Sequence, residues 1–227
     1  MRCLFLGLLL APLSALASLD DDVQFLGAGI YSHPKFDGSP IRHNDPIPQI
    51  NYSTGRWFAR TTEGILEGGA RLNIGQSAAI GVQAAYEDGP RGEHPGASLG
   101  VHAELEGKVG PAPVSSVFRL RQFLSNGKGW EADARVNVGI YEGHGWGLAL
   151  YGQATWANEK ILNNFYAVND SGLLFTALGT WGGYAITPKW LFLFSAEERR
   201  LADTAAPSPF VERRTGFYGS LGLAYRL

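Results

Sequence analysis

The sequence predicts an all-β protein, a transmembrane antiparallel up-and-down β-barrel of about 12 strands. Three observations predict this fold: an export segment at the N-terminus, an alternating strand at the C-terminus, and a composition rich in glycine and aromatic residues. The 227 residues include 30 Gly, 12 Phe, 9 Tyr and 6 Trp. In a membrane barrel only every other residue of a strand faces lipid, so no long apolar run is needed.

The first 17 residues have the pattern of a signal peptide. Arg2 supplies a positive charge, residues 4–10 are apolar, and Ala15-Leu16-Ala17 is an A-x-A cleavage site. The alternative is a short membrane anchor, which is disfavoured because the apolar run is too short to span a bilayer comfortably. We therefore expect a signal peptide over 1–17 and a single outer-membrane β-barrel over 18–227. Cys3 is the only cysteine, so the mature chain would have none.

Twelve segments with strand character follow the signal. In the sixth segment, Leu99 and Val101 share one face, while His102 and Glu104 share the other. Such period-two alternation is typical of a half-buried strand. The eighth segment alternates most regularly, and the ninth and eleventh place Trp residues near their ends, as in the aromatic girdles of membrane barrels. The expected strands are 23–32, 45–53, 55–62, 65–74, 78–87, 97–107, 114–124, 129–141, 145–156, 173–185, 188–200 and 214–227.

The connections on one side of the expected barrel are mostly shorter than those on the other side. Short turns are expected near residues 54–55, 75–77, 108–113, 142–145 and 187–188. The other side includes the four longest connections, 33–44, 88–96, 157–172 and 201–213. An even number of strands with short periplasmic turns is the usual bacterial pattern, so we expect both termini in the periplasm and the long connections outside the cell.

The final strand resembles the assembly signal of bacterial outer-membrane barrels. Phe217, Leu221 and Leu223 share its apolar face, which ends on Tyr225 and Leu227. The usual last residue of such a signal is Phe, so Leu227 is a departure. We interpret Tyr225 and Leu227 as the residues that guide insertion by the barrel-assembly machinery into outer-membrane lipid.

Charged residues fall on the inward faces of the sixth, seventh and eighth strands. A turn closing over residues 108–113 would place His102 opposite Arg119 and Glu104 opposite Val117, with Arg119 and Glu104 as diagonal neighbours. The charges either pair with one another inside a narrow lumen or line a polar pathway for small solutes. The expected lumen-facing residues are Glu104, Glu106, Arg119, Arg121, Glu131, Asp133 and Arg135.

No motif for catalysis, metal binding or a cofactor is present. The five His lack metal-ligand spacing, although His33 and His43 flank one loop and could meet there. The sequence contains no Gly-x-Ser-x-Gly elbow and no Gly-rich phosphate loop. With 19 basic and 21 acidic residues, the charge balance argues against a nucleic-acid partner. We expect a protein that is not an enzyme and holds no cofactor.

Several short motifs follow one another along the chain. Each motif is weak evidence alone, but their order is fairly specific. They are Leu26-Gly27-Ala28-Gly29-Ile30-Tyr31, Pro34-Lys35-Phe36-Asp37-Gly38-Ser39, Pro46-Ile47-Pro48, Asn51-Tyr52, Thr155-Trp156-Ala157, Asn164-Phe165-Tyr166-Ala167-Val168, Ser171-Gly172-Leu173, Ser208-Pro209-Phe210-Val211 and Gly222-Leu223-Ala224-Tyr225-Arg226-Leu227. In these motifs the chain resembles the MipA/OmpV family, named for the MltA-interacting protein.

The resemblance implies a scaffold that links a murein hydrolase to a murein synthase at the cell envelope. Two departures from the family pattern are visible: the chain ends in Tyr-Arg-Leu instead of Tyr-Arg-Phe, and the segment after Ser171-Gly172 is shorter than usual. The competing hypothesis, from a different functional class, is a narrow channel for small solutes.

Overall fold

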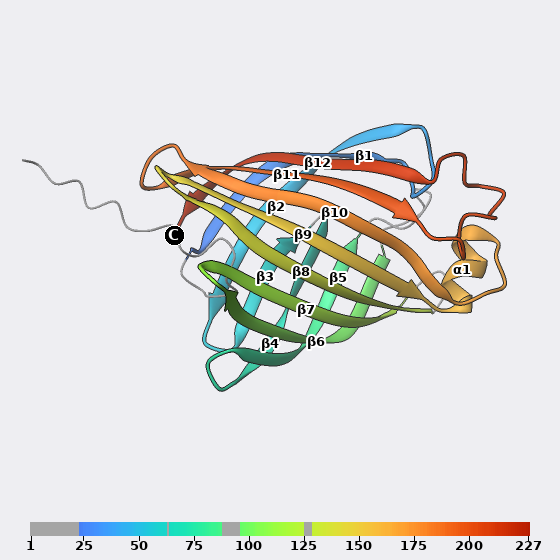
Figure 1. The fold of residues 1–227 in the computed structure, drawn as a ribbon, viewed down its shortest axis with the longest axis horizontal. Coiled ribbons are helices and arrows are strands. Elements are labelled where there is room, and N and C mark those ends of the chain that lie inside the picture. The colour runs from blue at the N-terminus through green and yellow to red at the C-terminus, as the bar shows by residue number, and fades with distance from the viewer. Residues whose placement is uncertain (1–22, 63, 88–95, 125–128) are drawn as a thin grey trace, which may run out of the picture.

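The computed structural model describes residues 23–62, 64–87, 96–124 and 129–227. Within these ranges twelve strands close into a barrel in which each strand pairs antiparallel with its neighbours along the chain, and β1 closes against β12 (Figure 1). The predicted all-β, 12-stranded antiparallel barrel is confirmed. The expected signal peptide, including Cys3, lies outside the described residues, so its removal stays a prediction.

The observed strands agree closely with the alternating segments of the sequence. Two strands, β4 and β5, have the expected bounds, and the others differ by at most three residues at either end. The strands are β1 Phe25–Pro34, β2 Arg42–Thr54, β3 Trp57–Thr62, β4 Ile65–Ile74, β5 Ala78–Glu87, β6 Gly96–Val109, β7 Ala112–Phe123, β8 Trp130–Gly143, β9 Trp146–Ala157, β10 Gly172–Ala185, β11 Trp190–Leu201 and β12 Thr215–Arg226.

The two faces of the strands have opposite chemistry. On the outer face large apolar side chains such as Val82, Val101 and Leu120 are about half exposed. On the inner face the intervening residues of the same strands are buried, and many of them are polar or charged, for example Gln83, His102 and Arg121. This is the arrangement of a barrel that contacts lipid outside and encloses a polar interior. No helix in the described part of the chain is long and apolar enough to cross a membrane.

One end of the barrel, here called the turn end, carries the short turns after β2, β4, β6, β8 and β10 and the C-terminus (Figure 1). Gly55, Gly75 and Gly110 have positive φ in three of these turns, and His144 and Gly145 do so in a fourth. Positive φ costs glycine little, whereas other residues rarely adopt it. The described chain begins at the same end, since Phe25 pairs with Arg226.

The opposite end, the helix end, carries the one helix of the described chain, α1 (Glu159–Tyr166). The sequence predicted only a polar connection over 157–172, so this helix was missed. Asn158 caps its first turn, because the side chain accepts a hydrogen bond from the Ile161 N–H at 3.2 Å. The helix ends where Ala167 adopts the left-handed conformation. Its apolar side chains Ile161, Leu162 and Tyr166 are buried, which stabilises so short a helix through packing.

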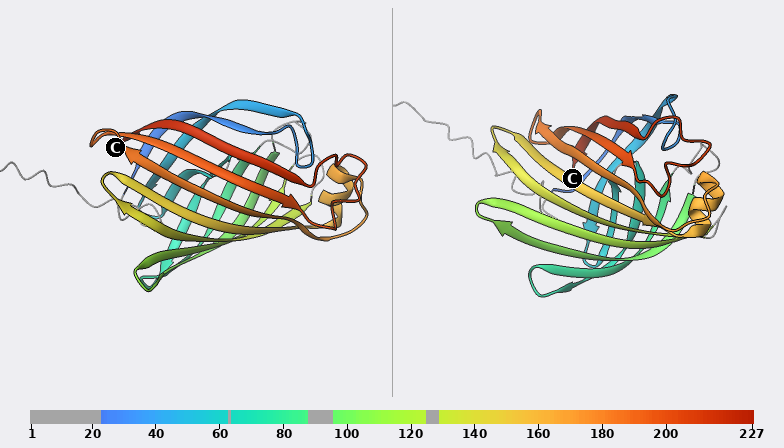
Figure 2. Two further views of the ribbon diagram at one scale, coloured as in Figure 1. Left: turned by 45° about the horizontal axis from the view of Figure 1, so that its top comes forward. Right: turned by 45° about the vertical axis from the view of Figure 1, so that its right-hand side comes forward.

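Three segments pack together at the helix end and form what we call the cap: 35–41, α1 and 202–214 (Figure 2). Ile161 and Leu162 of α1 lie in a buried cluster with Phe123, Phe175 and Ala205, from the strand ends and the last connection. The backbone N–H groups of residues 212 and 213 both donate to the carbonyl of residue 38, at 2.9 and 3.0 Å. The helix end therefore has its own small hydrophobic core.

Candidate functional site

The candidate site is the lumen, where charged residues of β6, β7 and β8 meet. The β6–β7 hairpin pairs His102 with Arg119 and Glu104 with Val117, which is the register that the turn spacing predicts. The β7–β8 hairpin pairs Arg119 with Asp133 and Arg121 with the residue at 131. Because side chains alternate between faces, this register sends all of these charges to the same side of the sheet.

The structure places the seven expected lumen residues on the inner face, though at different depths. Six are buried: Glu104, Arg119, Arg121, Glu131, Asp133 and Arg135. Glu106 shares their face in β6 but lies two residues nearer the turn end, where it is only half-buried. Burial of so many charges is costly unless each has a partner.

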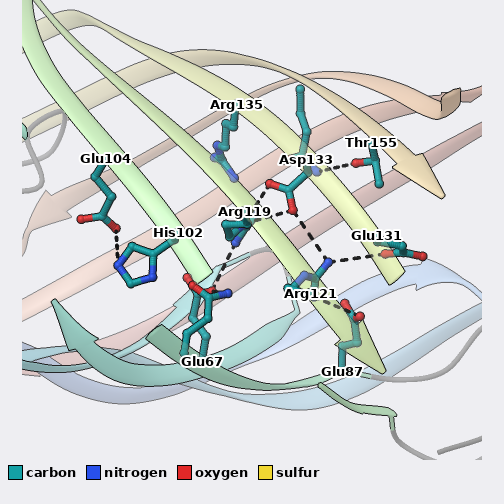
Figure 3. A network of polar contacts seen from close by, with 12 residues as sticks. Glu67, Glu87, His102, Glu104, Arg119, Arg121, Glu131, Asp133, Arg135 and Thr155 are labelled. Atoms are coloured by element: carbon teal, nitrogen blue, oxygen red, sulfur yellow. Dashed lines mark hydrogen bonds and ion pairs between the residues drawn. The ribbon is translucent and has the colours of Figure 1, made fainter. Parts of the chain in front are cut away.

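Arg119 and Arg121 lie on either side of Asp133 (Figure 3). Arg119 Nε donates to both Asp133 carboxylate oxygens, at 2.8 and 3.1 Å, and Arg121 Nη2 lies 3.9 Å from the same carboxylate. Arg121 also pairs with Glu87 at 3.0 Å and with Glu131 at 3.5 Å. The two guanidinium groups are thus separated and neutralised by acids of the neighbouring strands.

A second group of charges comes from β3, β4 and β6. Glu67 accepts from Arg60 and lies 3.3 Å from Arg119 Nη1, and Glu104 lies 2.9 Å from Arg60 and 3.5 Å from Arg71. Sequence reasoning missed Arg60, Glu67 and Arg71. Alternation in β4 was the available signal, since exposed Leu66 and Leu72 place Glu67 and Arg71 on the opposite face.

His102 sits beside this second group without joining it by a hydrogen bond. Its Nε2 lies 3.8 Å from Glu104, and its ring contacts Phe58 edge-on at 5.2 Å between centroids. Both ring nitrogens are buried without a hydrogen-bond partner among the described residues. The ring therefore fills space between charged groups.

A third group crosses to the other half of the barrel. The Tyr151 hydroxyl donates to Glu197 at 2.8 Å, and Glu197 also accepts from Arg199 Nε at 2.9 Å. The Arg199 guanidinium lies 4.2 Å from the ring centres of both Phe175 and Tyr218. It also pairs with Asp37 of the cap at 3.3 Å, so the cap is tied electrostatically to the lumen.

Two cavities lie in the interior near these groups, and Gly64 lines both of them. The turn-side cavity has a volume of about 240 Å³ and is lined by Arg119 and Tyr151, among others. The cap-side cavity measures about 140 Å³ and is lined by Arg121 and Arg199. Asp133 and Glu197 line neither cavity, yet each contacts residues of both. We call Asp133, Glu197 and these four partners the ion-pair layer, because they lie between the two cavities.

The histidines form no metal site in the described chain. The rings of His33 and His43 do approach, with centroids 6.4 Å apart, but His33 Nε2 is engaged by the Asp45 carboxylate at 2.8 Å. No group of three or more His, Cys, Asp or Glu that could hold a metal occurs among the residues described.

The barrel, its inward charges and its cap can now be set beside known proteins. The chain matches the family described as MltA-interacting protein MipA over residues 26–227. The chain belongs to the MipA family. The match runs from the second residue of β1 to Leu227 and includes the cap, so it concerns the whole barrel. A MipA-family barrel with an apolar outer face is an outer-membrane protein, and the predicted location is confirmed.

Three solved structures are similar to this chain at low sequence identity. A bacterial polysaccharide outer membrane secretin is 7% identical with a TM-score of 0.48, covering 92% of this chain and 99% of its own. The COG4313 outer membrane channel from Pseudomonas putida F1 is 12% identical with a TM-score of 0.48, covering 94% and 98%. A loop-deletion mutant of OmpT from Vibrio cholerae is 9% identical with a TM-score of 0.40, covering 84% and 65%. No curated protein matches the chain in sequence.

Proposed function

We propose that this MipA-family barrel is a non-enzymatic scaffold of the outer membrane, with its turn end toward the periplasm. Its partners would be a murein hydrolase of the MltA type, as the family description names, and a murein synthase. Both enzymes act on material beneath the outer membrane, so the turn end is the part of the barrel that they could reach.

The observation that supports this proposal is the buried ion-pair layer within the lumen. The ion-pair layer lies between the two cavities, and the cap packs over the helix end with Ile161 and Leu162 fully buried. A buried ion-paired layer is held by several short contacts, and opening it would leave charges without partners in a low dielectric. A barrel filled in this way is better suited to present a fixed surface than to conduct solutes.

A binding experiment with a matched pair of insertions tests the scaffold. The purified full-length barrel is immobilised, and an MltA-type hydrolase from the same bacterium is passed over it. A four-residue Gly-Ser insertion between Gly110 and Pro111, at the turn end, should weaken binding at least about tenfold. The same insertion after Asp170, at the helix end, should leave binding unchanged. Equal binding by both variants, or none by the unmodified barrel, would overturn the proposal.

The second candidate function is a narrow channel, which the two internal cavities favour. A path through the barrel would join them by displacing Asp133 or Glu197 from the partners described above. Conductance of the purified protein in planar bilayers separates the two hypotheses. Stable ohmic steps would support a channel, whereas a silent bilayer containing folded protein would support the scaffold.

A further inference from the structure

The turn-side cavity has two chemically different walls. The large apolar residues of one wall come from β10, β11, β1 and β2, where they stand beside polar residues such as Gln49, Asn51 and Ser195. The arginines of the other wall come from β3, β4, β7 and β8. The apolar wall presents Trp181, Leu193, Phe25 and Ile47, and the cationic wall presents Arg60, Arg71, Arg119 and Arg135. Because the two sets occupy opposite arcs, they face each other across the lumen.

Positive charge predominates at the surface of this cavity. Four guanidinium groups line it, whereas Glu67 is the one carboxylate that does so among the described residues. Two other acids that pair with these arginines, Glu104 and Asp133, do not line the cavity. Because the paired carboxylates lie behind the guanidinium groups, the cavity surface presents mainly N–H donors, which favours a ligand with acceptor oxygens over one with an ammonium group.

Aromatic rings hold two of the guanidinium groups in place. Arg135 lies over the Tyr151 ring at 3.7 Å from its centre, and its Nε donates to Asn137 at 2.9 Å. Arg60 lies 5.0 Å from the centre of the Phe58 ring. A stacked guanidinium loses little freedom when an acceptor arrives, which reduces the entropic cost of binding. On the opposite wall, the indole N–H of Trp181 is buried without a hydrogen-bond partner among the described residues.

We propose that the turn-side cavity binds a small organic anion that carries a carboxylate on an apolar or aromatic body. The carboxylate would lie against Arg135 and Arg71, and the apolar body against Phe25 and Trp181. At about 30 Å³ per water molecule, the cavity holds the equivalent of roughly eight waters, which suits a ligand of about ten non-hydrogen atoms. This inference concerns the interior alone, so it does not depend on the scaffold proposal.

Titration calorimetry on the folded, detergent-purified barrel tests the inference with 3-phenylpropionate as the probe. Two relatives of similar size, the neutral 3-phenylpropionamide and the cationic 3-phenylpropylamine, show whether binding depends on the charge of the ligand. We expect saturable binding of the carboxylate, binding at least about tenfold weaker for the amide, and none for the amine. Equal affinities for carboxylate and amide, or no saturable carboxylate binding, would overturn the proposal.

Two variants locate the binding. Arg135→Gln, on the wall of the turn-side cavity, should weaken 3-phenylpropionate binding at least about tenfold. Arg200→Gln removes a cation from the exposed outer face of β11 instead, and should leave the affinity within about twofold. Heat-modifiable migration on gels confirms that each variant is folded before titration. Should Arg135→Gln fail to fold, Arg71→Gln, on the same cavity wall, takes its place. Loss of binding in the control, or retention in the cavity variant, would contradict the assignment.

Discussion

Arg119 donates two hydrogen bonds to the Asp133 carboxylate through a single nitrogen, Nε, at 2.8 and 3.1 Å. The Asp133 carboxylate also lies 3.9 Å from Arg121, so this acid separates two buried cations. We predict that Asp133→Asn lowers the free energy of unfolding by about 3–5 kcal/mol, because two guanidinium groups would then face each other without the charge between them. Urea unfolding in lipid vesicles measures this, and the exposed Asp170→Asn serves as the control. A loss below about 1 kcal/mol would mean that other acids neutralise Arg119 and Arg121.

The cap should open separately from the barrel. Leu162 is fully buried between α1 and the strand ends, so Leu162→Ala should weaken cap packing by about 2–5 kcal/mol. Hydrogen exchange in α1 should accelerate, while exchange in β7 and β8 stays slow. Lys160→Ala, on the exposed side of the same helix, should leave hydrogen exchange unchanged both in α1 and in the barrel strands. Acceleration throughout the barrel would show that cap and barrel unfold as one unit.

Positions on the two faces of β7 should differ in their access to lipid. Leu120 is 47% exposed and Val117 is 7% exposed, because they lie on opposite faces. A cysteine at 120 should react with a lipid-soluble maleimide, and a cysteine at 117 should not. The reverse pattern would place the strand out of register by one residue, which turns every side chain to the other face.

The terminal strand should govern assembly. Tyr225 and Leu227 lie on the outer face at its end, where Tyr225 contacts Trp190 edge-on at 5.4 Å. Replacing both with Asp should abolish heat-modifiable folded protein in outer membranes, because carboxylates on the lipid face oppose insertion. Arg226→Gln, between them on the inner face, is the control. A normal folded yield of the double Asp variant would refute the role we assign to these residues.

The two ends of the barrel should lie on opposite sides of the membrane. An epitope inserted near Asp170, between α1 and β10 at the helix end, should be detected on intact cells. One inserted near His144, in a turn with positive φ, should be detected only after the outer membrane is permeabilised. Detection of both on intact cells would contradict our topology, in which one strand, β9, crosses the membrane between the two sites.

Much of the barrel was predictable because its rules are local. Strand alternation has a period of two residues, so the inward faces of β6, β7 and β8 could be read directly. A short turn then fixed which residues oppose each other, as for His102 and Arg119. The same alternation places Glu67 and Arg71 on the inward, polar face of β4.

The sequence by itself determined the class of fold, the number of strands, the family and the inward direction of the charges. Only the tertiary structure decided which charges meet across the lumen, such as Glu67 with Arg119 over 52 residues and Tyr151 with Glu197 over 46. It also decided that a polar connection becomes a buried helix. Hairpin register depends on a few neighbouring residues, whereas contacts across a barrel depend on how all twelve strands tilt and close, and burial of α1 depends on surfaces supplied by distant segments.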